Sequence, residues 1–251
     1  MSDHWDFYFA HVNDKPASLF VDLGIRESVP DPERPWLLWA WIYFQHPRDD
    51  GLSSSEEAET LSDIEDALNE AVENGVDGAL AGRITTDGRR EFYYYGPSFA
   101  GFEDAIARGM ERFAGYRWEA GSQQDPDWNQ YLDLLYPGPR DWQRISNRHV
   151  IEQLQSSGDP LEKERPVQHW AYFPDEATRA QFVATIQPLG FSITSQEVLE
   201  DEEHPLRYSV GCERVDHVDW DSINAVTLEL FELANSLGGN YDGWGTSVEK
   251  E

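Results

Sequence analysis

The order of predicted strands and helices constrains this fold most, because the same order occurs twice along the chain. In the first half, the strand-like segments are 36–44, 77–85, 89–95 and 116–120, and the helical segments follow residue 53 and cover 99–113. In the second half, the strand-like segments are 167–173, 190–194, 207–212 and the C-terminal stretch, and helices follow Asp175 and Asp219. Each half therefore has the order β-α-β-β-α-β, the split pattern of a ferredoxin-like sandwich. The sequence predicts an α+β protein with two tandem ferredoxin-like sandwiches and antiparallel sheets.

Local signals support this assignment. The run Trp36–Phe44 is short, continuously apolar and aromatic, which is typical of a central strand covered on both faces. Thr86-Asp87-Gly88 lies between two strand-like segments and predicts a hairpin. Ser53 to Glu56 has the spacing of a capping box, and Asp175 and Asp219 are expected to cap the helices that follow them.

A short internal similarity supports a duplicated architecture. Trp41-Ile-Tyr-Phe44 and Trp170-Ala-Tyr-Phe173 occupy the same place in the element order of the two halves. We therefore expect an N-terminal domain over 1–120, an aromatic-rich linker over 121–144 that packs on a domain, and a C-terminal domain over 145–251.

Composition excludes several classes of function. The chain has 251 residues and a formal net charge of −29, and direct binding of nucleic acid needs a basic face. Its single cysteine, Cys212, rules out an intramolecular disulfide. The N-terminal segment lacks the pattern of a signal peptide, and the longest apolar run is too short to span a bilayer. We expect a cytoplasmic protein that binds no membrane.

The sequence offers no clear catalytic or metal-binding group. Ser98 lies in a segment that resembles a nucleophile elbow only loosely, because its second glycine is one position too far along. The seven histidines lack the spacing of metal ligands, so we predict no metal and no cofactor. His169 is expected in the core or at a sheet edge, and strand alternation predicts that Cys212 points into the core, where a thiol is inert.

The segment Ser236–Val248, "SLGGNYDGWGTSV", combines four glycines with two large aromatic side chains. A phosphate-binding glycine loop opens a helix, whereas this one follows a predicted helix, so it would repel an anion. We expect the glycines Gly238, Gly239 and Gly243 to serve structure: Gly238 as a helix C-cap and Asp242-Gly243 as a turn before a closing strand. Tyr241 and Trp244 either pack on the sheet or anchor a partner, with Trp244 partly buried and Tyr241 and Asp242 the more exposed pair.

Two segments of the second half resemble a known family. "RPVQHWAYF" at 165–173 and "GGNYDGW" at 238–244 are similar to motifs of the regulators of ribonuclease E activity, type B, and the resemblance covers about 145–248. "GRITTDGRREFYYYG" and "DWNQYLDLLYPGPRDW" in the first half resemble a family of unknown function, domain 695, that often precedes it. The resemblance implies a ferredoxin-like fold and, for the second domain, inhibition of an endoribonuclease by protein contact without catalysis.

Two functions follow from these observations. The first is a non-enzymatic regulator or adaptor that binds a protein with a basic segment, a ribonuclease by the resemblance, through His169, Trp170, Tyr241, Asp242 and Trp244. The alternative is a hydrolase or small-ligand enzyme whose site lies in the groove between the domains and uses His169, Asp242 or linker acids.

Overall fold

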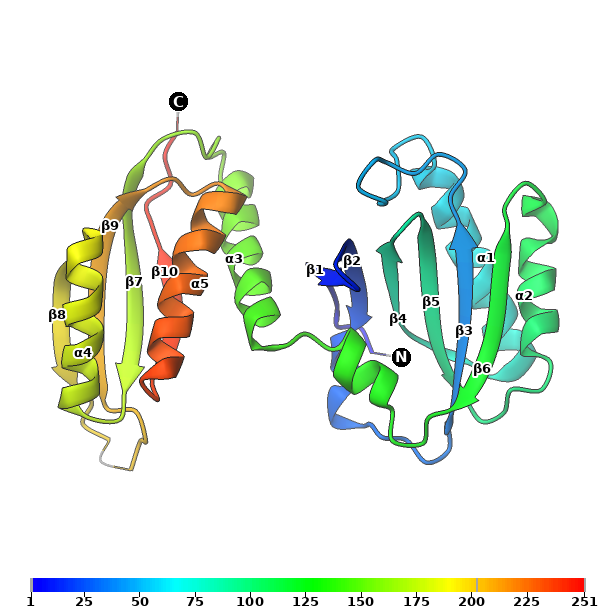
Figure 1. Ribbon diagram of the computed structural model, residues 1–251, viewed down its shortest axis with the longest axis horizontal. Helices are drawn as coiled ribbons and strands as arrows, with labels where there is room; N and C mark the ends of the chain where they lie inside the picture. Colours follow the sequence, from blue (N-terminus) through cyan, green and yellow to red (C-terminus); the bar gives the residue numbers. More distant parts are fainter. Residues whose placement is uncertain (1, 202, 251) are drawn as a thin grey trace. The chain divides into compact units, whose positions relative to one another are not determined.

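The computed structural model describes residues 2–201 and 203–250, and the chain divides into two compact units between Asp141 and Trp142. Each unit contains one antiparallel sheet with helices packed on it, so the protein is a mixed α/β fold (Figure 1). The division falls inside the predicted linker. The first part of that segment belongs to the first unit as the end of a strand and as a short π-helix, η3 (Gln130–Leu135).

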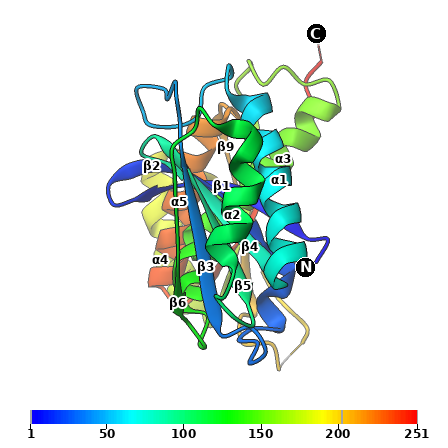
Figure 2. The ribbon, with the colours of Figure 1, turned by 90° about the vertical axis from the view of Figure 1, so that its right-hand side faces the viewer.

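The first unit has a six-stranded sheet in the order β1-β2-β4-β5-β3-β6. Its strands are β1 (Trp5–Val12), β2 (Lys15–Asp22), β3 (Trp36–Tyr43), β4 (Ala79–Thr86), β5 (Arg89–Gly96) and β6 (Trp118–Gln124). Two helices, α1 (Ala58–Val76) and α2 (Phe102–Met110), lie side by side on one face of this sheet (Figure 2). Their buried apolar side chains pack against Leu38, Ala40, Ile42, Phe92 and Tyr94 of the sheet.

The opposite face of this sheet is partly covered by the segment around η3. The indole of Trp128 stacks on the ring of Tyr95 with centroids 3.7 Å apart. The Tyr131 hydroxyl donates to the backbone carbonyl of Asp22 over 2.7 Å, and the Tyr8 hydroxyl donates to that of Leu135 over 3.0 Å. The aromatic side chains of the predicted linker therefore pack on the first unit.

The hairpin β1–β2 is an element that the sequence analysis did not predict. Its two-residue turn is Asn13-Asp14, and both residues have positive φ angles, 51° and 62°. The predicted hairpin at Asp87-Gly88 is confirmed, because β4 and β5 pair on either side of it. β3 is confirmed as an interior strand, since it pairs with β5 and with β6.

The predicted capping box at Ser53–Glu56 was wrong. Helix α1 begins at Ala58, and its N-cap residue Glu57 makes no side-chain capping bond. The Glu57 carboxylate instead accepts hydrogen bonds from the backbone amides of Gln45 and His46, over 2.9 and 2.8 Å. The Glu57 carboxylate therefore joins the beginning of α1 to the segment that follows β3.

The second unit has a four-stranded sheet in the order β10-β7-β9-β8. Its strands are β7 (Arg165–Phe173), β8 (Ser192–Val198), β9 (Tyr208–Asp216) and β10 (Asn240–Gly245), and its helices are α3 (Pro139–Ser156), α4 (Glu176–Ile186) and α5 (Trp220–Ser236). The side chains of Asp175 and Asp219 accept bonds from backbone amides of the first turn of α4 and α5, which confirms both predicted caps. α3, which begins just before the division, packs with α4 and α5 on one face of this sheet (Figure 1).

Candidate functional site

The candidate site lies on β7 and β10, which pair along one edge of the second sheet. Side chains alternate along β7, so that Val167, His169 and Ala171 point toward the helices and Trp170 points to the other face. The sequence-predicted site residues are therefore divided between the two faces of the sheet.

The helix-facing side chains His169, Tyr241 and Trp244 are buried, with 1%, 5% and 7% of their surfaces exposed. Tyr241 was expected to be exposed, and the structure places it in the core instead. Trp244 lies among apolar side chains of α3, α5 and β7, and its indole nitrogen donates to the Asn147 amide oxygen over 2.9 Å.

The glycine-rich segment positions these aromatic residues in a way that differs from the predicted turn. Asp242-Gly243 is not a turn, because β10 continues through it and pairs with β7 on both sides, with a shift of register between Tyr241 and Gly243. Residues three apart in a regular strand lie on opposite faces, and the extra residue of this bulge brings Tyr241 and Trp244 to the same face. Gly243 has a φ of 128°, which favours glycine at this position.

The other two structural glycines, Gly238 and Gly239, lie at the C-terminal end of α5. Gly238 follows the C-cap residue Leu237 with a φ of 69°, as expected for a helix C-cap. At Gly239, a Cβ atom would lie 2.6 Å from the Phe173 ring and from the backbone oxygen of Tyr172, so the chain passes close to β7 there.

A buried polar network joins the elements behind the site. The Asn147 side chain on α3 donates to the Asn224 amide oxygen over 2.9 Å and to the Thr227 hydroxyl over 2.6 Å, both on α5. Gln143 donates to the Asn147 oxygen that also accepts from Trp244. The network fixes α3 to α5 and to β10. The network was not predicted from the sequence, because Asn147 and its partners Asn224 and Thr227 are far apart along the chain.

His169 lies in an environment that keeps its imidazole neutral. Its Nδ1 and the Tyr241 hydroxyl share a hydrogen bond of 2.8 Å, and the thiol of Cys212 and the guanidinium of Arg214 belong to the adjacent strand β9. Burial, assisted by Arg214, lowers the pKa of His169 from 6.5 to about 3. Burial also raises the pKa of the Cys212 thiol to about 12. The imidazole and the thiol are therefore uncharged at neutral pH.

We expect this histidine to make the second unit sensitive to acid. The unfolded imidazole binds a proton below about pH 6.5, whereas the folded one does so only near pH 3. The neutral imidazole therefore contributes its full stabilisation above pH 6.5, and this contribution is lost as the pH falls. Because one pKa unit corresponds to 1.36 kcal/mol, the free energy of unfolding should be about 3 kcal/mol lower at pH 4. Urea unfolding at pH 7 and pH 4 measures this loss. The His169→Gln variant, which cannot titrate, should lose about 3 kcal/mol less, and equal losses would contradict the assignment.

The face opposite the helices, which we call the open sheet face, presents Trp170. Register places Gly211 of β9 and Gly243 of β10 beside Trp170 on its two neighbouring strands. Trp170 is 39% exposed, and Val215, four residues along β9 from Gly211 and on the same face, is 58% exposed. A Cβ atom at Gly245 of β10 would lie 3.4 and 3.5 Å from the Trp170 ring, so the indole lies over the backbone of β10 at that glycine and remains accessible. Asp242 is also exposed, at the bulge of the edge strand β10.

The described residues provide no metal site. Within 2–201 and 203–250, no group of three or more His, Cys, Asp or Glu side chains is arranged to hold an ion. In the same ranges, no helix is both long and apolar enough to cross a bilayer.

Comparison with known proteins assigns each unit to a family. Residues 3–136 match the model of a family of unknown function, DUF695, and residues 144–246 match that of the regulator of ribonuclease activity B. A protein of that second name from Sodalis glossinidius is 31% identical over 111 residues, which cover 43% of this chain and 75% of the relative. Relatives of the same name from Xenorhabdus nematophila and Escherichia coli are 29% and 28% identical, over 41% and 46% of this chain and 72% and 84% of their own lengths.

Proposed function

The chain belongs to the regulator of ribonuclease activity B family through its second unit and to the DUF695 family through its first, and we propose that it regulates a ribonuclease by direct protein contact. The relatives are named as regulators of ribonuclease activity, which supports a ribonuclease as the partner. By the resemblance, the enzyme is an endoribonuclease of the ribonuclease E type. A partner that acts on cellular RNA implies a cytoplasmic location.

The observation that carries this proposal is the exposed Trp170 on the open sheet face. Tryptophan is favoured among the residues that dominate the energy of protein interfaces, and an exposed one on a glycine-flanked surface can be covered completely by a partner. We therefore assign the contact to Trp170 with Asp242 at its edge. His169, Tyr241 and Trp244 support this surface from the core.

Charge favours a basic segment of the partner. By strand register, Glu197 and Glu213 lie on the open sheet face, within a chain of net charge −29. A basic peptide would be attracted to this face, whereas RNA would be repelled. The protein should thus bind the ribonuclease and not its substrate.

Strand order supports a ferredoxin-like topology for both units. The four strands β10-β7-β9-β8 have the spatial order in which the fourth strand of β-α-β-β-α-β lies beside the first. The strands β4-β5-β3-β6 show the same order in the first unit, with β1–β2 added at the edge. We propose that the two units are variants of one architecture.

The proposal includes no catalytic step. His169, the histidine of the alternative enzyme reading, is enclosed in the core and uncharged. Asp125, a buried acid of the predicted linker segment, accepts hydrogen bonds from the Tyr95 hydroxyl and from the backbone amides of Asn129 and Gln130. These groups serve structure, so they do not favour a hydrolase.

Replacing Trp170 by Ala should weaken binding to the ribonuclease by about 2 kcal/mol or more, roughly 30-fold. Titration calorimetry with a purified ribonuclease E-type enzyme measures the affinity, and cleavage of a fluorescent RNA measures the inhibition. Leu189→Ala is the matched control, because Leu189 is 42% exposed in the same unit but lies in η4 (Gln187–Leu189) after α4. Equal effects of the two variants, or binding of the protein to the RNA alone, would contradict the proposal.

A further inference from the structure

The first unit contains a pocket that the proposed function does not use. Its sheet extends beyond its helices, because β1 and β2 add two strands next to β4. Register places Phe20 and Ser18 of β2, Arg83 and Thr85 of β4, and Arg90 of β5 on the same face as the helix-covered Phe92. These side chains line a pocket of about 350 Å³, to which Arg48 and Ser53 of the loop before α1 also contribute.

The pocket has a local excess of positive charge. Arg83 and Arg90 both pair with one carboxylate oxygen of Glu65 on α1, at 2.9 and 3.2 Å. Arg48 pairs with Asp50 at 2.6 Å. Three guanidinium groups therefore face two carboxylates, in a chain whose net charge is −29.

The two inner arginines retain unused hydrogen-bond donors. Arg83 contacts Glu65 through Nη1 and stacks over the Phe20 ring at 4.9 Å. Arg90 uses Nη1 for Glu65 and for the backbone carbonyl of Leu61. The Nε atoms of both residues are buried and, within the part of the chain that the structure describes, have no acceptor, so each guanidinium is only partly hydrogen-bonded. Burial and Arg83 lower the pKa of Arg90 to about 10, which is consistent with a cation that lacks full compensation.

We infer that this pocket binds a small organic anion, with an oxyanion head on the arginines and a flat apolar body on the phenylalanine side. A guanidinium matches the planar geometry of a carboxylate or the oxygens of a phosphate, and both heads share this chemistry. The Phe20 ring already stacks with Trp5 at 5.0 Å and lies under Arg83, so the apolar side of the pocket consists of its edge together with Phe7 and Phe9 of β1. The side chains of Ser18, Ser53 and Thr85 also line the pocket and could orient the head. A volume of about 350 Å³ is near the lower end for small-molecule sites, so it suits a small molecule and not a peptide or RNA.

This site is independent of the open sheet face. It lies in the DUF695 unit, and its residues are absent from the ribonuclease-binding proposal. The inference gives the first unit a function of its own, as a receptor for a small anionic ligand.

Calorimetric titration of the full chain with phenyl phosphate, benzoate, inorganic phosphate and neutral benzyl alcohol tests the inference. We expect phenyl phosphate or benzoate to bind at least tenfold more tightly than benzyl alcohol, and the affinity to fall as salt is added. The tighter of the two anions identifies the head group. No binding of either anion, or equal binding of the alcohol, would overturn the inference.

Two variants locate the site. Arg83→Gln should weaken anion binding at least tenfold while leaving Glu65 paired with Arg90. Ser18→Trp fills the pocket without a change of charge and should abolish binding. The control Arg117→Gln removes the same charge from an exposed side chain next to β6, at the other edge of the sheet. Anion binding that survives Ser18→Trp, or that falls equally in Arg117→Gln, would place the ligand elsewhere and overturn the inference.

Discussion

The Trp244→Ala variant should be less stable than the parent protein by about 3–5 kcal/mol, the usual cost of removing a buried tryptophan. The indole is 7% exposed and packs with Ile151, Val167 and Ile223, which come from three different elements. The substitution would leave a cavity and would also remove the bond to Asn147. Urea unfolding of the full chain, followed by circular dichroism and fitted with separate transitions where the units unfold apart, measures the loss.

Trp170 supplies a matched control for this prediction. The two tryptophans lie on adjacent strands, but they face opposite sides of the sheet. Trp170→Ala should change the free energy of unfolding by less than about 1 kcal/mol, since its indole is 39% exposed. Similar losses of stability in both variants would show that the open sheet face is part of a core.

The Trp244→Phe variant separates packing from hydrogen bonding. It keeps an aromatic ring in the cavity and removes the indole donor, and the Asn147 oxygen still accepts from Gln143. We expect a loss near 1 kcal/mol, the usual net value of one hydrogen bond.

Much of the second unit could be predicted from the sequence, because its signals are local. The apolar spacing of α4 and α5, their aspartate caps and the alternation of β7 each depend on neighbouring residues. The bulge in β10 could not be predicted in the same way. Asp-Gly is typical of a turn, and only the pairing of both flanking segments with β7 makes it part of a strand.

The β1–β2 hairpin was not predicted from the sequence, although β1 contains the aromatic residues Trp5, Phe7, Tyr8 and Phe9. The usual turn signal is a glycine, and here Asn13 and Asp14 adopt positive φ angles without one. The arginine pocket was missed for a related reason. Arg83 and Arg90 are seven residues apart, and they become neighbours because the β4–β5 hairpin pairs Thr85 with Arg90. Strand β2 also contributes residues to the pocket, and the hairpin that contains β2 was itself not predicted.

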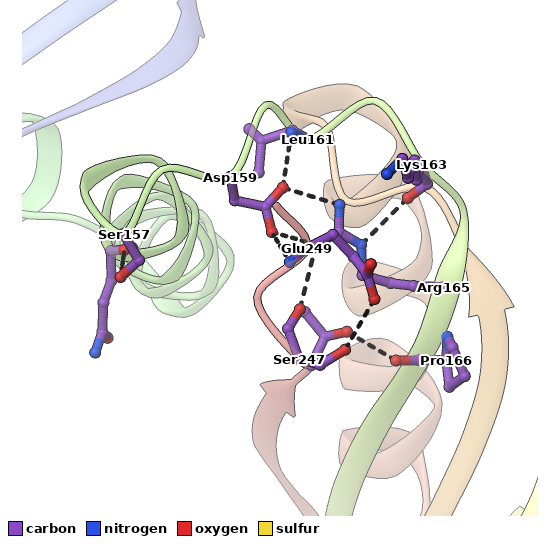
Figure 3. Close-up of polar contacts among 10 residues, drawn as sticks. Ser157, Asp159, Leu161, Lys163, Arg165, Pro166, Ser247 and Glu249 are labelled. Atoms are coloured by element: carbon purple, nitrogen blue, oxygen red, sulfur yellow. Dashed lines mark hydrogen bonds and ion pairs between the residues drawn. The ribbon is translucent and has the colours of Figure 1, made fainter. Parts of the chain in front are cut away.

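A second buried contact, between Asp159 and Arg165, holds the C-terminal segment on the second unit (Figure 3). Both side chains are almost fully buried, at 0% and 2% exposed. The carboxylate also accepts bonds from the backbone amides of Leu161 and Glu249, each over 2.8 Å, and Arg165 donates to the Ser247 carbonyl over 3.2 Å. Arg165 and these amides hold the pKa of Asp159 well below its usual range. The pair therefore stays ionised until strongly acidic pH.

Replacing Asp159 by Ala should destabilise the second unit by about 3–5 kcal/mol, because it leaves the Arg165 guanidinium buried without its counter-charge. Urea unfolding measures this loss, and faster proteolysis after Thr246 would show release of the C-terminal segment. Glu164→Ala is the control, since Glu164 is 62% exposed and pairs only at the surface with His217, so a change within about 0.5 kcal/mol is expected.

The double variant Asp159→Ala with Arg165→Met decides how this contact stabilises the fold. Removing one partner leaves a buried charge without its counter-charge. Replacing both partners and leaving an apolar side chain causes a smaller loss of stability. We therefore expect the double variant to be more stable than Asp159→Ala alone, while its C-terminal segment remains susceptible to protease, because the bonds to Ser247 and Glu249 are absent. If the double variant were as unstable as the single one, the loss of stability would come from the missing backbone contacts of Asp159 and not from the unpaired charge of Arg165.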